Sequence, residues 1–232
     1  MLAFLALAAC FSWPLQILVY TGHTPAAAAP ALLTLAALGP SLAAIVLTRG
    51  GVLGTLAARP PAGWVLVALV APSALVLLAA LVDATLGGPW PALVALSASS
   101  ALAAILPALG EELGLRVHLY PRLVPRHGRV GAALATGVAW IVWHVPSGLG
   151  PHPALVPALL FLGGLLVLSP PMAWLYERSG RSAWVALAAH AGASAVLVRH
   201  GGSWRATLLH LGVFVVVAIG ATVALGQGAS SE

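Results

Sequence analysis

Apolar runs recur from one end of this sequence to the other, separated by short breaks that hold the charged, proline and glycine residues. Hydrophobic residues make up 61% of the 232-residue chain and charged residues 6%, and the mean hydropathy is +1.03. So few polar side chains cannot cover the surface of a water-soluble globule. Because a backbone in hydrocarbon must satisfy its own hydrogen bonds, we expect an all-α polytopic membrane protein, with residues 1–232 forming one integral-membrane domain.

The breaks between the apolar runs divide the chain into eight candidate membrane spans. Most of them are close to the roughly 20 residues that a helix needs to cross about 30 Å of hydrocarbon. The predicted spans are Leu2–Tyr20, Ala31–Thr48, Trp64–Leu86, Ala92–Leu119, Val130–Val145, Ala154–Tyr176, Ala183–Val198 and Ala206–Leu225.

The arginines predict an orientation, because cytoplasmic loops of membrane proteins are enriched in basic residues. With the N-terminus in the cytoplasm, only Arg199 and Arg205 fall on the opposite side, and the connections around Gly22, Gly88 and Gly150 hold no arginine. We therefore expect both termini to be cytoplasmic. The net charge of +5 is then explained by loops that face an anionic lipid leaflet, and no nucleic-acid partner is expected. The arginine bias and the absence of lysine favour a bacterial inner or plasma membrane.

Two adjacent carboxylates end an apolar run, where an uncompensated charge costs about 2.5 to 3.5 kcal/mol. Glu112 and Arg116 are four residues apart with the acid first, which is the favourable order for an ion pair on one helix face. Glu111 is rotated by about 100° from its neighbour, so its carboxylate is predicted to be free for another role. His118 follows Glu111 by seven residues on the same predicted face, which leaves open a contact with a substrate.

Two further helices carry ionisable residues. His144 ends the fifth predicted span with Trp140 one turn earlier, and His190 lies in the seventh span with Ser194 four residues later. At 1.5 Å per residue, Glu111, His144 and His190 lie roughly 13 to 22 Å from the cytoplasmic ends of their spans. We therefore expect these three side chains to meet at similar depth in the membrane.

The order Glu-Glu-x-x-x-Arg, aromatic-x-x-x-His and His-x-x-x-small polar resembles the CAAX prenyl protease and bacteriocin-processing (CPBP, or Abi) family of intramembrane proteases. The longer strings GEELGLRVHLYPRL, WIVWHVP and LYERSGRSAWVALAAHAGAS are similar to those of its bacterial members. The resemblance covers residues 97–197, which we interpret as the catalytic core region. The other spans match only by hydropathy.

The resemblance implies an intramembrane endopeptidase whose substrate is a membrane protein or peptide. Glu111 and His144 are expected to hold and deprotonate the attacking water, and His190 and Ser194 to stabilise the oxyanion. The family usually has Asn at the last motif position. The hydroxyl of Ser194 donates one hydrogen bond but reaches less far than an amide, so weaker activity is one expected consequence.

Three alternatives remain open at this point. Zinc is possible, because Glu111, His144 and His190 are a legitimate three-ligand set, although the paired carboxylates suit a metal-free site at least as well. A non-catalytic relative, acting in bacteriocin immunity or as a membrane scaffold, would use the same fold without hydrolysis. A proton-coupled transporter would be expected to show inverted repeats, and none is visible in the sequence.

Overall fold

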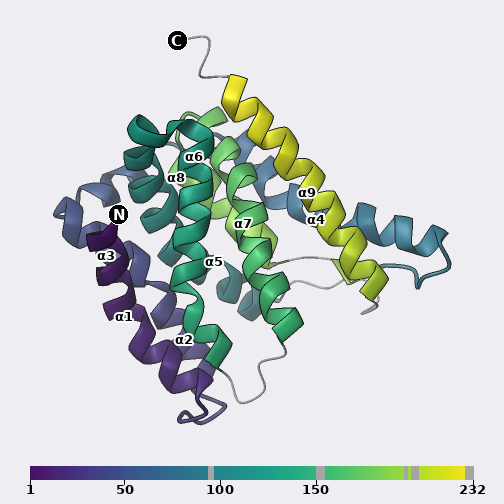
Figure 1. Ribbon diagram of the computed structural model, residues 1–232, viewed down its shortest axis with the longest axis horizontal. Helices are drawn as coiled ribbons and strands as arrows, with labels where there is room; N and C mark the ends of the chain where they lie inside the picture. Colours follow the sequence, from purple (N-terminus) through teal and green to yellow (C-terminus); the bar gives the residue numbers. More distant parts are fainter. Residues whose placement is uncertain (94–96, 150–154, 196–197, 200–203, 228–232) are drawn as a thin grey trace.

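The computed structural model describes residues 1–93, 97–149, 155–195, 198–199 and 204–227. This part of the chain is almost entirely helical (Figure 1). Its α-helices are α1 (Leu2–Tyr20), α2 (Ala29–Ala37), α3 (Gly39–Thr48), α4 (Ala62–Thr85), α5 (Ala98–Glu112), α6 (Tyr120–Trp143), α7 (Leu155–Arg178), α8 (Ala183–Ser194) and α9 (Trp204–Gln227). The short elements are the 3-10 helices η1 (Gly51–Ala57) and η3 (Val145–Leu149), the π-helix η2 (Leu113–Leu119), and the antiparallel pair β1 (Ala92–Leu93) and β2 (Val198–Arg199).

Five helical segments of the described residues are long and apolar enough to cross a membrane. The outward faces of these segments are apolar as well: Leu66 on α4 and Val216 on α9 are 63% and 69% exposed. An aliphatic outer face of this kind suits lipid rather than water. The predicted all-α fold is thus confirmed, and the five segments are consistent with a multi-pass membrane protein. The five segments are Leu2–Tyr20, Ala29–Thr48, Ala62–Thr85, Leu159–Arg178 and Leu208–Gln227.

The other three predicted spans differ from the structure. The span Ala92–Leu119 is not one helix, because a strand precedes α5 and a π-helix follows it. The span Val130–Val145 is the part of α6 beyond a kink at Gly128, where φ is 65°. The span Ala183–Val198 ends as a helix at Ser194. The predicted connection at Gly150 and the predicted start of a span at Ala154 lie outside the described residues.

α8 is the central helix of the bundle. Its 12 residues rise only about 18 Å, and they are buried almost all round against α4, α5 and α7. Gly192 permits this packing, because a Cβ at that position would collide with the backbone of Leu69 on α4. Hydropathy cannot separate such an interior helix from a membrane span, since both are apolar on every face.

Two glycines let the segment that carries Glu111 and Glu112 pack closely on α2 and α3. A Cβ at Gly110 would collide with the backbone of Ala37, and one at Gly114 with the backbone of Pro40. The hydroxyl of Ser41 also donates a hydrogen bond to the carbonyl of Leu109 (2.8 Å). Small residues four apart let helix backbones approach closely. The glycines of the GEELG motif therefore face α2 and α3, and the carboxylates between them face the rest of the bundle.

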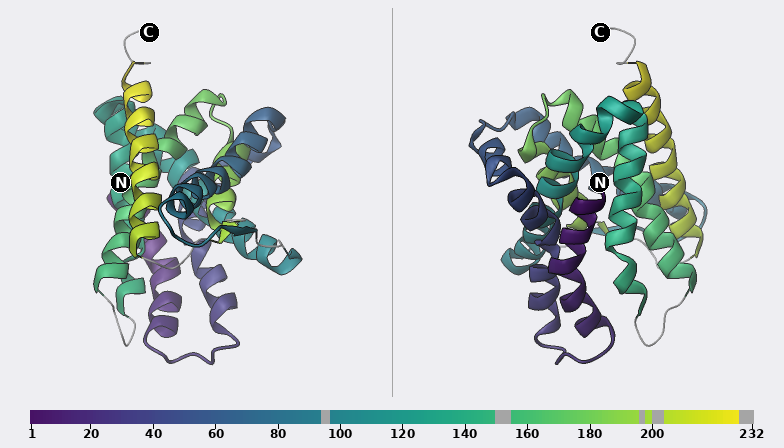
Figure 2. Two further views of the ribbon diagram at one scale, coloured as in Figure 1. Left: turned by 90° about the vertical axis from the view of Figure 1, so that its right-hand side faces the viewer. Right: turned by 60° about the vertical axis from the view of Figure 1, so that its left-hand side comes forward.

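The arginine-rich connections gather at one end of the bundle. The connection after α3, the start of α6 and the α7–α8 turn lie together, opposite the α1–α2 connection and the end of α6 (Figure 2). Arg205, one of the two arginines that the orientation rule leaves on the other side, forms an ion pair with Asp83 (Nε to Oδ1, 2.6 Å). Because Asp83 neutralises Arg205, the position of this arginine is weak evidence for the orientation of the protein in the membrane.

Candidate active site

Glu111, His144 and His190 line one cavity of about 320 Å³. They come from the end of α5, the C-terminal cap of α6 and the interior of α8. Ser194 lines the same cavity. The structure therefore brings together the four residues that the motifs single out. The remaining lining residues are Pro107, Trp140, Phe161, Leu165, Leu168, Met172 and Ala193.

Trp140 orients the carboxylate of Glu111. The indole Nε1 of Trp140 donates a hydrogen bond to its Oε2 at 2.5 Å, and the Glu111 side chain is 5% exposed at the cavity wall. A carboxylate accepts several hydrogen bonds, so the other oxygen keeps its capacity for a further donor. The short contact fixes the orientation of Glu111 and leaves it available to a water in the cavity.

Glu112 points away from the cavity into the protein and is fully buried together with Arg116. Arg116 Nε lies 3.5 Å from Glu112 Oε2, while Glu112 Oε1 lies 2.9 Å from Nδ1 of His190. The guanidinium also packs over the Trp140 ring at 4.6 Å and donates to the sulfur of Met172. The expected contact between Glu112 and Arg116 is present, and the structure adds His190 as a second partner of the same carboxylate.

In both histidines the Nδ1 nitrogen faces a protein neighbour, which leaves the Nε2 nitrogen for the cavity. His144 Nδ1 lies 2.9 Å from the carbonyl of Trp140. A carbonyl only accepts, so that nitrogen carries the proton and Nε2 of neutral His144 is an acceptor. His190 Nδ1 likewise faces a carboxylate oxygen of Glu112 and donates to it, so its Nε2 donates only when the ring is doubly protonated. The aromatic edges of Trp143 and Phe161 fix the His144 ring.

Ser194 is the last residue of α8, and its side chain is exposed. His190 is buried one helical turn earlier. Both residues line the cavity, as their spacing predicts. The hydroxyl therefore sits at the open edge of the site rather than in its buried wall.

Zinc binding, which the sequence leaves open, does not fit the geometry. Within the described residues, no three His, Cys, Asp or Glu side chains are grouped as a metal ion requires.

His118 does not line this cavity and cannot contact a substrate there; it is buried against Phe4 of α1, with ring centroids 5.5 Å apart. Between Glu111 and His118 the chain forms the π-helix η2. The i to i+5 hydrogen bonds of a π-helix rotate later residues relative to an α-helix. The expectation that two residues seven apart share a face fails for this reason.

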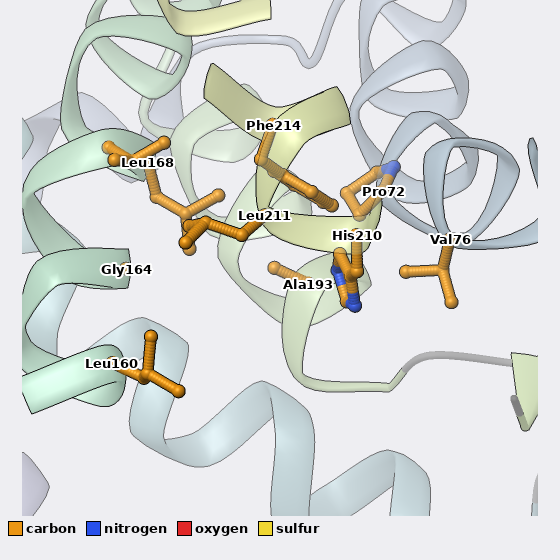
Figure 3. A pocket seen from close by; sticks show the side chains of 10 residues that line it. Pro72, Val76, Leu160, Gly164, Leu168, Ala193, His210, Leu211 and Phe214 are labelled. Carbon is orange, nitrogen blue, oxygen red and sulfur yellow. The ribbon is translucent and has the colours of Figure 1, made fainter. Parts of the chain in front are cut away.

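An apolar cavity of about 270 Å³ adjoins the site between α4, α7, α8 and α9. Figure 3 shows Leu168 of α7, Ala193 of α8 and Phe214 of α9 around it, with the ring of His210 beside Val76. Leu168 and Ala193 also line the cavity of Glu111. The two spaces thus share a thin wall of aliphatic side chains.

The sequence does not predict the central position of Trp140 in the site. It donates to Glu111, packs on Arg116 and lies against His190, with ring centroids 5.4 Å apart. The only signal for it is the aromatic-x-x-x-His spacing, which places it near His144 but says nothing about Glu111. Met172 of α7 carries no signal at all, although it contacts Arg116.

Residues 93–196 match the family model of the type II CAAX prenyl endopeptidase Rce1-like proteins. The resemblance based on the three motifs is thereby confirmed. A comparison with curated proteins found no match.

Proposed function

Residues 93–196 belong to the Rce1-like family of type II CAAX prenyl endopeptidases, which are peptide hydrolases, and on this premise we propose that the protein is an intramembrane endopeptidase. Its substrate is a membrane-associated protein or peptide. The apolar cavity of Figure 3, which shares Leu168 and Ala193 with the site, supports a substrate with an apolar segment next to the scissile bond.

A water between Glu111 and His144 is the nucleophile. Both groups accept hydrogen bonds, so one water donates a hydrogen to each and turns a lone pair toward the substrate carbonyl. Its oxygen bonds to the carbonyl carbon as Glu111 takes the proton. The proton then passes to the amide nitrogen, the C–N bond breaks, and a carboxyl group and an amine result.

His190 and Ser194 stabilise the oxyanion formed in this step. His190 Nδ1 donates to the Glu112 carboxylate at 2.9 Å, which fixes the ring, and a doubly protonated His190 donates from Nε2 as well. Arg116 lies on the other side of Glu112. The hydroxyl of Ser194 supplies a second donor at the cavity edge.

The observation that carries this proposal is the convergence of Glu111, His144 and His190 from three helices on one cavity. Its test is the cleavage of a peptide library by the purified protein and by Glu111→Gln, which keeps the shape and removes the base. The rate should fall by about 100-fold to 10,000-fold. Glu177→Gln, the same change in an ion pair outside the cavity, should cleave normally. A folded Glu111→Gln protein with full activity would exclude the mechanism.

The membrane arrangement is part of the proposal. We infer one integral-membrane domain with both termini in the cytoplasm, supported by the gathering of the arginine-rich connections at one end (Figure 2). A multi-pass protein in a bacterial inner or plasma membrane is the corresponding location. Reporter fusions after Arg126 and after Ser147 should report opposite sides, and the same side for both would contradict it.

The alternative is a non-catalytic relative that binds peptides or membrane partners, as in bacteriocin immunity or scaffolding. One observation favours this alternative: Ser194 replaces the usual Asn, and its side chain is exposed. Absence of cleavage by folded wild-type protein and by Ser194→Asn would select this function.

A further inference from the structure

A second polar cavity, of about 610 Å³, lies where the first turn of α1, the end of α3 and the start of α6 meet. The residues proposed for catalysis do not line it. The start of α6, whose residues line this cavity, lies at the arginine-rich end of the bundle (Figure 2). Its lining residues are Met1, Ala3, Phe4, Leu47, His118, Leu119, Arg122, Leu123, Pro125, Arg126 and His127.

The cavity carries positive charge that no lining carboxylate neutralises. Arg122 donates from Nη1 to the carbonyl of His118 (2.7 Å), which fixes its guanidinium at the wall without cancelling its charge. Arg126 follows one turn later on the same face. Carboxylates elsewhere in the described chain have partners of their own: Asp83 with Arg205, Glu111 with Trp140, Glu112 with Arg116 and His190, and Glu177 with Arg181.

A buried polar side chain in the wall lacks a partner. His118 is 4% exposed, and its Nδ1 has no hydrogen-bond partner among the described residues. α1 also begins at this cavity without a side-chain cap at Met1. The free N–H groups of a helix N-terminus favour an anion.

Part of the cavity wall is apolar. It is formed by Phe4, Leu47, Leu119 and Leu123. We propose that this cavity binds an anionic phosphate group, which Arg122 and Arg126 recognise. The apolar wall points to a phosphate carried by an anionic lipid rather than to free phosphate.

The test uses the purified full chain in neutral detergent. Binding of dihexanoyl phosphatidylglycerol, dihexanoyl phosphatidylcholine and inorganic phosphate is titrated separately. The double variant Arg122→Gln/Arg126→Gln should weaken phosphatidylglycerol binding by about 30-fold. The matched control Arg59→Gln/Arg178→Gln removes the same charge from exposed positions outside the cavity, and its affinity should stay within about threefold.

The outcomes separate the sources of the phosphate. Preference for phosphatidylglycerol without competition by inorganic phosphate assigns the site to a lipid headgroup, and competition at equal affinity assigns it to free phosphate. Equal binding of both lipids, or equal loss in both double variants, overturns the proposal. Should the cavity variant fail to fold, His118→Phe keeps the stacking on Phe4 and removes the unpaired nitrogen; unchanged phosphatidylglycerol binding in that variant overturns the proposal as well.

Discussion

Glu111 and Glu112 lie at one end of the π-helix η2, and His118 and the arginines of the second cavity lie at the other. At the first end the opposite charges are buried together: Glu112 and Arg116 are both 0% exposed, Glu112 also accepts from His190, and Arg116 packs on Trp140. At the second end the guanidinium groups of Arg122 and Arg126 have no lining acid. A buried charge is costly unless another group of the protein pairs with it, whereas a charge at the edge of the bundle can remain unpaired until a ligand binds.

The largest expected effect that separates the two ends concerns stability. Glu112→Gln leaves Arg116 buried beside Met172 and the Trp140 ring without its ion-pair partner. Breaking a buried ion pair costs about 3 to 5 kcal/mol. Thermal unfolding in detergent should show this loss, and Arg126→Gln should change stability by no more than about 0.5 kcal/mol.

The double variant Glu112→Gln/Arg116→Met sharpens the same prediction. It removes both charges at similar volume, so it should recover part of the stability that Glu112→Gln loses. Equal stability of wild type and Glu112→Gln would mean that the ion pair between Glu112 and Arg116, at 3.5 Å, does not stabilise the protein.

The next effect concerns the oxyanion. Ser194→Ala removes one donor from the edge of the catalytic cavity, and the loss of such a donor lowers turnover by about 100-fold to 1000-fold. Ser194→Asn should raise turnover by restoring a longer amide donor. Cleavage of one membrane substrate at matched folded concentration checks both variants. Equal rates in all three proteins would reduce position 194 to a packing role, with His190 acting alone.

A smaller effect is expected at Trp140. Trp140→Phe keeps an aromatic ring over Arg116 and removes the donor to Glu111. A hydrogen bond to a charged group contributes about 1.5 to 3 kcal/mol, so cleavage should slow by about 10-fold to 150-fold. The cleavage rate of the folded Trp140→Phe protein, measured on one membrane substrate at matched concentration, checks this. An unchanged rate would assign Trp140 a packing role only.

The smallest effect is expected from the second cavity on catalysis. Arg122→Gln/Arg126→Gln changes no residue that lines the catalytic cavity. Cleavage of a soluble peptide in neutral detergent should therefore stay within about twofold of wild type. A large loss of rate in the folded double variant would show that the two ends of η2 act as one unit.

Much of the site is predictable because its chemistry is scarce in this sequence. Only 6% of residues are charged, so a carboxylate pair inside an apolar run is conspicuous. The four-residue spacing from His190 to Ser194 correctly predicts that both side chains line one cavity. The partners of these residues are not predictable in the same way. Glu112 accepts from His190, 78 positions away, and hydropathy contains no information about such a contact.

Composition and helical periodicity predict an all-α protein with membrane-spanning helices, and the order of the motifs indicates the family whose model residues 93–196 match. Tertiary structure decides which apolar runs are spans and which, like α8, are short interior helices. It also decides that η2 turns His118 away from Glu111 into a separate cavity. The physical reason is that periodicity describes one helix at a time. The wider π-helical turn and the close approach at Gly110, Gly114 and Gly192 depend on the neighbouring backbones.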